Sequence, residues 1–277
     1  MANSEAHAAG PALKDRIIGI KGGGDLATGI AVRLFRSGFT RIFIMEIPEP
    51  TTIRRRVAFA SALYEGEFTV EGITGAAVRH SEDIATAWEE KKIAVLADPR
   101  WKTLARIRPD VLVDAVIAKK NLGTKINDAG LTIALGPGFA AGKDADAVIE
   151  TRRGHDLGRV IRNGEAQPNT SRPEPVNGFS SQRLVRAPGD GRFTAAARIG
   201  DHVNAGETLG HVNGLPVNAG ITGIIRGLIR DGLTVAAGKK IGDIDPRDDA
   251  GYCRTLSDKA RALGGAVLEV ILDRFNR

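Results

Sequence analysis

The sequence predicts an α/β fold, with a Rossmann-like, doubly wound and mostly parallel sheet, because a strand, a glycine turn, a helix and a second strand follow one another near its start. Residues 16–20 form a short β-branched apolar run ended by glycines, which is typical of a buried strand. Apolar residues recur at helical spacing over residues 25–37, and residues 41–45 form the next apolar strand. Together these segments predict a βαβ unit.

Strands and helices continue to alternate after this unit, which predicts one α/β domain over residues 16–162. Helices are expected at residues 52–64 and 81–88. The second of them begins at Ser81, which is suited to cap a helix and is followed by two acids in the first turn. Further strands are expected at residues 76–78, 93–96, 111–117 and 131–135.

The composition changes near residue 163. Residues 163–182 are rich in Pro, Asn, Gly and Ser and are expected to form a linker, whereas residues 183–246 hold short β-like runs between glycines. This second region contains an internal repeat, because five of its residues recur at one constant offset of 32 residues. The repeated pairs are Gly191 with Gly223, Gly200 with Gly232, Val203 with Val235, Gly206 with Gly238, and Gly210 with Gly242.

Each half of the repeat resembles one half of a biotinyl/lipoyl-like domain, so residues 183–246 are predicted to form a small β barrel-sandwich. Carrier domains of that kind place a modifiable lysine between the halves, but residues 212–217 contain no lysine. We therefore expect the fold without the swinging-arm function. Residues 247–277 are predicted to be a C-terminal helical segment weakened at Gly264-Gly265, and residues 1–15 a disordered tail.

Composition narrows the classes of partner. The chain has a formal net charge of +6, but its basic clusters are short and lack interleaved aromatic residues. A small anionic ligand is therefore expected and a nucleic acid is not. A single cysteine, Cys253, excludes an intrachain disulfide and a multi-cysteine metal site. The sequence has no signal-peptide core and no apolar run of membrane-spanning length, which predicts a cytoplasmic protein without a membrane partner.

The glycine turn at residues 22–25 is the leading candidate for ligand binding. It matches the pattern G-x-G-x-x-A between a strand and a helix, and the free N–H groups of the helix start favour a phosphate. Glu46 ends the second strand, where a carboxylate can accept hydrogen bonds from ribose hydroxyls. The alternative is a tight turn with a solvated Glu46. The residues expected to hold the cofactor here are Gly22, Gly23, Gly24, Asp25, Leu26, Ala27 and Glu46.

Asp25 complicates this hypothesis, because its carboxylate is suited to cap the helix and repels an anion. Either the phosphate lies over the first two glycines, or Asp25 meets a metal or a hydroxyl group. Siroheme-synthase-type NAD domains are similar here, with an acid after three glycines. Residues 54–56 are arginines, of which one can reach a cofactor phosphate, although a solvated helix surface is the simpler interpretation. Glu46 disfavours a cofactor with a 2′-phosphate.

Two later loops leave the carboxyl ends of predicted strands, where ligands bind in sheets of this kind. In the first loop, Lys119, Lys120 and Asn121 can offer cations and an amide to an anionic substrate. In the second, Gly136 and Gly138 can let the backbone approach a ligand closely. Ordinary turn structure is the alternative explanation for both loops.

Two further residues are candidates on their own. His155 is a candidate acid or base, although such a histidine is more often simply exposed. Cys253 is more often an inert packing residue, but neighbouring arginines can activate a thiol. The other histidines show no metal-ligand spacing, so no metal site is predicted. The candidate catalytic residues are thus Lys119, Lys120, Asn121, His155 and Cys253.

Long stretches of the chain carry a family resemblance. They are IKGGGDLATGIAVRL (20–34), VDAVIAKKNLGT (113–124), LGPGFAAGKDADAVIETRRGHDLGRVI (135–161), and GKKIGDIDPR to CRTLSDKARALGGAVLE (238–269). They are similar to a bacterial family of selenium-dependent molybdenum hydroxylase accessory proteins, and the similarity runs through nearly everything from residue 16 onward. That family is itself reminiscent of xanthine dehydrogenase maturation factors.

The resemblance implies a role in the maturation of a molybdenum hydroxylase, an enzyme related to xanthine dehydrogenase. It implies a nucleotide or a molybdopterin dinucleotide as ligand and the hydroxylase apoenzyme as partner, and a homo-oligomer is left open. It implies no catalytic residue.

Three other functions also stay open. One is an NAD(H)-dependent oxidoreductase with Lys119 or His155 as proton donor. Another is an amino-acid-kinase-like enzyme, because residues 20–24 faintly resemble the first phosphate loop of that family, although a helix directly after the glycines argues against it. The last is a protein-binding scaffold that uses the surface of the β domain.

Overall fold

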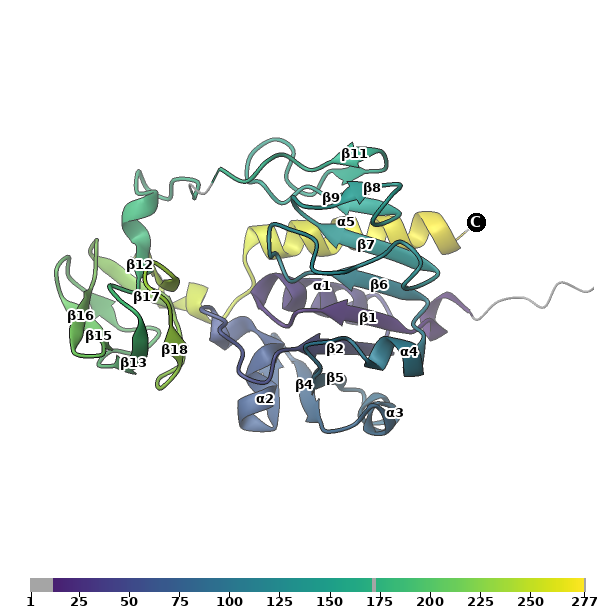
Figure 1. The fold of residues 1–277 in the computed structure, drawn as a ribbon, viewed down its shortest axis with the longest axis horizontal. Coiled ribbons are helices and arrows are strands. Elements are labelled where there is room, and N and C mark those ends of the chain that lie inside the picture. Colours follow the sequence, from purple (N-terminus) through teal and green to yellow (C-terminus); the bar gives the residue numbers. More distant parts are fainter. Residues whose placement is uncertain (1–11, 171–172, 277) are drawn as a thin grey trace, which may run out of the picture.

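The computed structural model describes residues 12–170 and 173–276. Its largest element is a nine-stranded sheet with the order β10-β9-β7-β6-β1-β2-β5-β4-β3 (Figure 1). The strands are β1 (Ile18–Lys21), β2 (Ile42–Glu46), β3 (Glu67–Val70), β4 (Ile73–Val78), β5 (Ile93–Ala97), β6 (Val111–Asp114), β7 (Leu131–Leu135), β9 (Ala147–Ile149) and β10 (Val160–Ile161).

The sheet is parallel except at its two edges. β3 runs antiparallel to β4, and β10 runs antiparallel to β9. At the centre, Ile20 of β1 pairs with Ile44 of β2 and with Val113 of β6. The carboxyl ends of β1, β2 and β6 therefore meet at one edge of the sheet, where the glycine turn begins.

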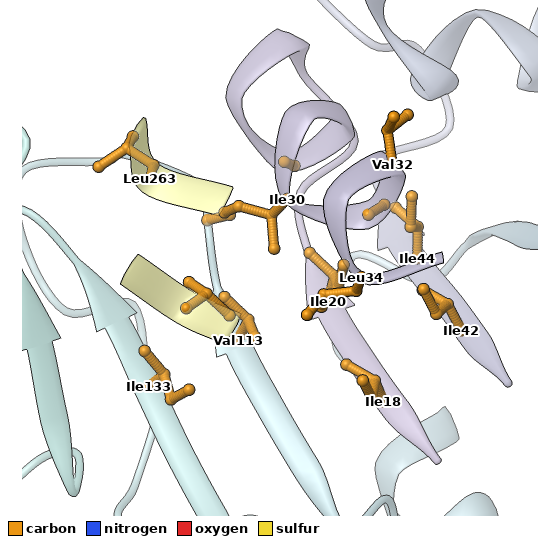
Figure 2. Close-up of a cluster of buried hydrophobic side chains, with 14 of the residues drawn as sticks. Ile18, Ile20, Ile30, Val32, Leu34, Ile42, Ile44, Val113, Ile133 and Leu263 are labelled. Carbon is orange, nitrogen blue, oxygen red and sulfur yellow. The ribbon is translucent and has the colours of Figure 1, made fainter. Parts of the chain in front are cut away.

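One face of the sheet is covered by the two long helices, α1 (Asp25–Arg36) and α5 (Asp258–Phe275). Figure 2 shows Ile30 and Leu34 of α1 above the isoleucines of β1 and β2, with Leu263 of α5 beside them. The helices approach closely because Gly29 lies against Ala260, where a Cβ atom on Gly29 would meet the Ala260 Cβ at 2.7 Å. This contact fixes where α5 begins relative to the glycine turn.

The other face is covered by short helices. Phe43 and Met45 of β2 point to this side, because neighbouring residues of a strand face opposite ways. They pack in a cluster with Ile84 and partly buried Trp101. The short helices on this face are α3 (Ile84–Glu89) and α4 (Thr103–Ile107), whereas α2 (Ala62–Glu65) lies on the face of α1, because Ala62 belongs to the same cluster as Ile30. The 3-10 turns are η1 (Leu13–Asp15), η2 (Arg55–Val57), η3 (Phe59–Ser61), η4 (Ser81–Asp83), η5 (Ser181–Arg183) and η6 (Ala250–Cys253).

The second β region, which begins at β12, contains two four-stranded sheets with the orders β12-β19-β17-β14 and β16-β15-β13-β18. The offset of 32 residues found in the sequence relates the strands of one sheet to those of the other, position by position in these orders. The strands are β12 (Leu184–Arg186), β13 (Gly191–Ala195), β14 (His202–Val203), β15 (Thr208–Val212), β16 (Leu215–Asn218), β17 (Gly223–Leu228), β18 (Thr234–Val235) and β19 (Lys240–Asp245).

The repeated residues have equivalent surroundings. Gly191 and Gly223 start β13 and β17 with φ of 144° and 152°, where a side chain is strained. Val203 and Val235 are both buried in one hydrophobic cluster that draws on both sheets. Neither half therefore buries its apolar face alone.

The predicted fold class, a Rossmann-like doubly wound sheet followed by a small β barrel-sandwich domain, is wrong, although the expected C-terminal helix is present as α5. A doubly wound sheet carries helices in its crossovers on both faces. Here β6 connects to β7 through residues 115–130, which are loop, and β7 connects to β9 through the two-residue strand β8 (Ala140–Ala141). α5, from the far end of the chain, covers the face that crossover helices would cover in that half.

The second β region is also tied directly to the large sheet's loops, which a separate domain would not require. The Leu228 N–H of β17 donates to the Ile53 carbonyl at 3.0 Å, and Arg55 Nε donates to the Leu228 carbonyl at 3.1 Å. A Cβ atom on Gly227 would meet Ile53 Cγ2 at 2.7 Å. Strand β17 and the segment after β2 therefore pack as one interface.

Other expectations differ in detail. The helix expected over residues 52–64 is broken into η2, η3 and the four-residue α2, because Ala60 N–H leaves the helical pattern to donate to the Gly23 carbonyl at 2.9 Å. α5 is continuous through Gly264-Gly265, since Gly264 packs against α1. The linker region 163–182 includes β11 (Gly164–Glu165), which pairs with β8.

The predicted disordered tail falls largely on residues 1–11, outside the described part of the chain, and its last three residues form η1. Within the part that is described, no helix combines the length and hydropathy needed to cross a membrane. The cytoplasmic location stays a prediction.

Candidate functional site

The glycine turn lies where the sequence places it, but its polar groups have protein partners. Gly22 has φ of 88° and donates its N–H to the Met45 carbonyl at 2.8 Å. The Gly23 N–H donates to Glu46 Oε2 at 2.8 Å, and the Ile47 N–H donates to Glu46 Oε1 at 2.7 Å. Burial raises the pKa of Glu46 against the effect of these bonds. The carboxylate expected to contact a ribose thus holds the turn itself.

One side of the turn is covered and the other is open. The segment that includes Ala60 lies on Gly23, where a Cβ atom would meet Ala60 Cβ at 3.2 Å. A Cβ atom on Gly24 would meet nothing within 4 Å. Gly24 precedes α1, and Leu26 in the first turn of that helix lines a cavity, whereas Ala27 is buried in the core. A ligand of this turn is therefore expected over Gly24 and the start of α1.

Asp25, the residue that argued against an anion, is neutralised by a partner. Arg54 Nη1 lies 3.2 Å from Asp25 Oδ2, and Arg54 Nη2 donates to the carbonyls of Tyr252 and Thr255 at 3.1 and 2.9 Å. Because the pair cancels one negative charge at the start of α1, Asp25 repels an anion less than the sequence suggests.

A cavity of about 330 Å³ opens beside this helix start, between the carboxyl edge of the large sheet and the second β region. Cations outnumber acids among its lining residues by eight to four, and the acids are Asp25, Glu150, Glu174 and Asp243. The cations are Arg54, Lys119, Arg152, Arg153, Arg183, Arg226, Lys240 and Lys259. Such an excess inside a concave site attracts anions, because the surrounding protein focuses the field.

Arg226 of β17 is the most unusual of these cations. It is 7% exposed, and among the described residues its guanidinium makes no hydrogen bond, with Nε buried and unpartnered. Its nearest acids are Asp245 at 3.6 Å and Asp243 at 3.9 Å from Nη1. Burial is the main cause that lowers the pKa of Arg226, followed by the charge of Arg54. A buried charge without hydrogen bonds is costly, so this arrangement needs an explanation.

The acids nearest to Arg226 have other partners. Asp243 Oδ1 accepts from Arg183 Nη1 at 2.8 Å. Asp245 accepts from Arg247 Nε at 2.9 Å and from Arg247 Nη2 at 2.6 Å. Each carboxylate therefore has a hydrogen-bond donor other than Arg226, and Arg226 lines the cavity.

The loop after β6 contributes one predicted residue to the cavity. Lys119 lines it with φ of 62°. Lys120 lies on Gly138, where a Cβ atom would come within 2.5 Å of the Lys120 Cα, and Gly138 has φ of 102°. Asn121 closes a turn, since its Oδ1 accepts from the Gly123 and Thr124 N–H groups at 2.8 and 2.7 Å.

The other predicted residues lie elsewhere. Gly136 has φ of 75° and donates its N–H to the Ile149 carbonyl at 2.8 Å, which is a turn role. His155 is exposed and does not line the cavity. Cys253 is 1% exposed and lies 3.5 Å from the Ile225 carbonyl, and burial raises the pKa of its thiol. Cys253 is thus a packing residue in this structure.

Sequence reasoning missed several of the cavity's cations. Arg226 has a visible signal, because a single arginine interrupts the buried run Gly223–Leu228. Lys259 also has one, because a cation in the first turn of a helix opposes the helix dipole. Arg183 has none, since only the folded chain brings it to Asp243. Across the described residues, no group of His, Cys, Asp and Glu is arranged to hold a metal ion.

The comparisons with known proteins give a relative of unknown role. The chain is 45% identical over 257 residues to "Uncharacterized protein YqeB" of Escherichia coli (strain K12), which covers 93% of this chain and 47% of the relative. The chain therefore spans about half the length of the curated relative it matches. No family model matches the chain.

Solved structures are only distantly similar. An aspartoacylase family protein of Mesorhizobium loti is 12% identical, with 83% of this chain and 85% of that chain covered and a TM-score of 0.27. TcdA (CsdL) is 13% identical, with 96% and 90% covered and a TM-score of 0.34. A succinylglutamate desuccinylase/aspartoacylase of Rhodobacter sphaeroides is 25% identical over 23% of this chain and 22% of that chain, with a TM-score of 0.21.

The comparisons do not support the role expected from the family resemblance, because the matched relative is uncharacterized. The description of the chain as a molybdenum hydroxylase accessory protein is therefore not retained, and the Rossmann and barrel-sandwich description is corrected by the topology above.

Proposed function

We propose that this chain binds a small anionic molecule in the cavity between the start of α1 and strand β17. Phosphate-bearing molecules, nucleotides among them, are the first class to test. The proposal does not depend on a role in molybdenum hydroxylase maturation, and the narrower family assignment rests on the sequence resemblance alone.

The observation that carries the proposal is the buried guanidinium of Arg226, which makes no hydrogen bond to any described residue although two acids lie within 4 Å of Nη1. Removing a charge from water without hydrogen bonds costs several kcal/mol, on the order of the whole stability of a domain. A protein that keeps such a group gains from it in another state, and an anion in the cavity supplies the missing acceptors. Arginine suits this role because its planar fork matches phosphate and carboxylate oxygens.

Two further features fit the same ligand class. The N-terminus of α1 has no side-chain cap, so its N–H groups and dipole favour a negative group. Leu26, Ile117 and Pro137 line the cavity with apolar surface, which suits a ligand with a non-ionic part beside its anionic group.

The test is calorimetric titration of the protein with pyrophosphate, ATP, NAD and citrate. At least one is expected to bind, and Arg226→Gln is expected to weaken that binding by roughly tenfold or more, because a hydrogen bond to a charged group contributes about 1.5–3 kcal/mol. Arg198→Gln is the control, because it removes one positive charge from an exposed position of the same β region. Equal losses in both variants would indicate general charge attraction, and no binding by the wild type would leave the scaffold hypothesis.

A further inference from the structure

Lys259 occupies an unusual position for a cation. It is the second residue of α5, after the cap formed by Ser257, whose Oγ accepts from the Ala260 N–H at 3.2 Å. The positive end of the helix dipole disfavours an ammonium group there. Lys259 is half-buried and lines the same cavity as Arg226. Lys259 therefore lines a cation-rich cavity from a helix position that disfavours a positive charge.

The acids whose charges act on Lys259 are engaged by other groups. Asp258 accepts two hydrogen bonds from Arg153, one of 2.7 Å between Nη2 and Oδ1. The two oxygens of Glu150 accept from the N–H groups of Arg152 and Gln167, each at 2.7 Å. Among the described residues, the Lys259 side chain has no hydrogen bond and no ion pair.

These surroundings lower the pKa of the Lys259 amine. Burial is the main cause that lowers the pKa of Lys259, and the charge of Arg153 acts in the same direction. Asp25, Glu150 and Asp258 act in the opposite direction without reversing the shift. Lysines that form covalent adducts with carbonyl compounds are activated in this way, by desolvation and by a neighbouring cation.

We propose, building on the anion-binding function above, that Lys259 forms an imine with an aldehyde or ketone whose anionic group is held in the cavity. The neutral Lys259 Nζ attacks the carbonyl carbon, and one of its two protons passes to the carbonyl oxygen to give a carbinolamine. The hydroxyl group then leaves as water with the second nitrogen proton, and the C=N bond forms. The step consumes one amine and one carbonyl and releases one water, so it needs neither oxidant nor reductant.

The test uses pyridoxal 5′-phosphate as an anionic aldehyde probe, with borohydride to fix any imine and peptide mass spectrometry to locate it. The peptide that contains Lys259 is expected to carry the reduced adduct in the wild type and to lose it in Lys259→Arg. Excess pyrophosphate is expected to suppress the adduct by competing for the cavity. Lys119 is the matched control, since it lines the same cavity but is exposed.

The outcomes separate this proposal from the one on which it rests. An adduct on Lys259 that appears before one on Lys119 supports the imine. If pyrophosphate binds but Lys259 is labelled no faster than Lys119, the imine proposal is wrong and anion binding stands. If pyrophosphate and the other anions fail to bind and labelling is spread over surface lysines, both proposals fail.

Discussion

Two buried cations, one in the large sheet and one in the second β region, have different surroundings. Lys21 ends β1 with its side chain 1% exposed, and its Nζ donates to Thr124 Oγ1 at 2.7 Å and to Asp128 Oδ2 at 3.2 Å. The ring of Trp101 covers it at 4.0 Å. Arg226 is nearly as buried but makes no hydrogen bond to any described residue.

The Lys21 group continues into a satisfied network. Thr124 Oγ1 donates to Asp114 Oδ2 at 2.6 Å, and Asp114 Oδ1 accepts from the Val116 N–H at 3.2 Å. Burial lowers the pKa of Lys21 and raises that of Asp114, while their mutual attraction acts against both shifts. Burial by itself therefore does not mark a ligand site. Lys21 has the hydrogen-bond partners expected of a structural cation, whereas Arg226 has two acids nearby but no hydrogen bond to a described residue, as expected of a cation that binds a ligand.

The largest effect is expected at Lys21. Lys21→Met removes one partner of the buried network and leaves Asp114 without its compensating charge. We expect the free energy of unfolding, measured by urea denaturation, to fall by about 3–5 kcal/mol. Lys125→Met is the control, because Lys125 is exposed near the same network, and it is expected to change stability by less than about 0.5 kcal/mol. If both variants changed the free energy of unfolding by the same small amount, Lys21 would have no structural role.

A smaller effect is expected where α5 packs on α1. A Cβ atom on Gly264 would lie 2.9 Å from the Gly29 carbonyl oxygen, so Gly264→Ala must push the helices apart. We expect a loss of about 1–3 kcal/mol and weaker anion binding, since α5 carries Lys259 into the cavity. Gly265→Ala is the matched control, because a Cβ atom there meets nothing, and it is expected to stabilise by about 0.5–1 kcal/mol. A change of unfolding free energy with the same sign in both variants would contradict the close packing of Gly264 on α1.

Asp258 gives a smaller, pH-dependent effect. Its hydrogen bonds from Arg153 lower the pKa of the carboxyl from 3.8 to about 2. Because the folded pKa lies below the ordinary value, the pair stabilises the protein above about pH 4 and that contribution is lost as the pH falls toward 2. The side chain is 71% exposed, so Asp258→Asn is expected to cost about 0.5 kcal/mol or less at pH 7. Unfolding curves of both proteins between pH 2 and 7 should converge at the acid end, and a constant difference would exclude this linkage.

The sequence indicates part of this fold from local patterns. The order of β1, α1 and β2, and the repeat with its offset of 32 residues, can be read from apolar spacing and glycines. The absence of crossover helices before β7 could not be predicted from the sequence, because the apolar run of β7 is the same whether a helix or a loop precedes it. α5 packs on α1 through Gly29, a contact more than 200 residues apart in the chain.

The candidate site was less predictable than the fold. The glycine turn and Lys119 follow strand ends, so sequence reasoning finds them. Arg226 and Lys259 reach the cavity from elements far along the chain, and their function as cations depends on which acids are already paired. The hydrogen bond between Glu46 and the Gly23 N–H is likewise a tertiary contact that the sequence does not reveal, because the two residues are 23 positions apart.

The most direct test of the account is the stability of Arg226→Gln with and without pyrophosphate. In anion-free buffer, the variant is expected to unfold at the same urea concentration as the wild type or a higher one, because Asp243 and Asp245 keep their other arginines. Pyrophosphate at one hundred times its dissociation constant is expected to stabilise the wild type by about 2.7 kcal/mol and the variant by much less. A loss of about 3 kcal/mol or more in anion-free buffer would instead make Arg226 a structural partner of these acids and contradict the account.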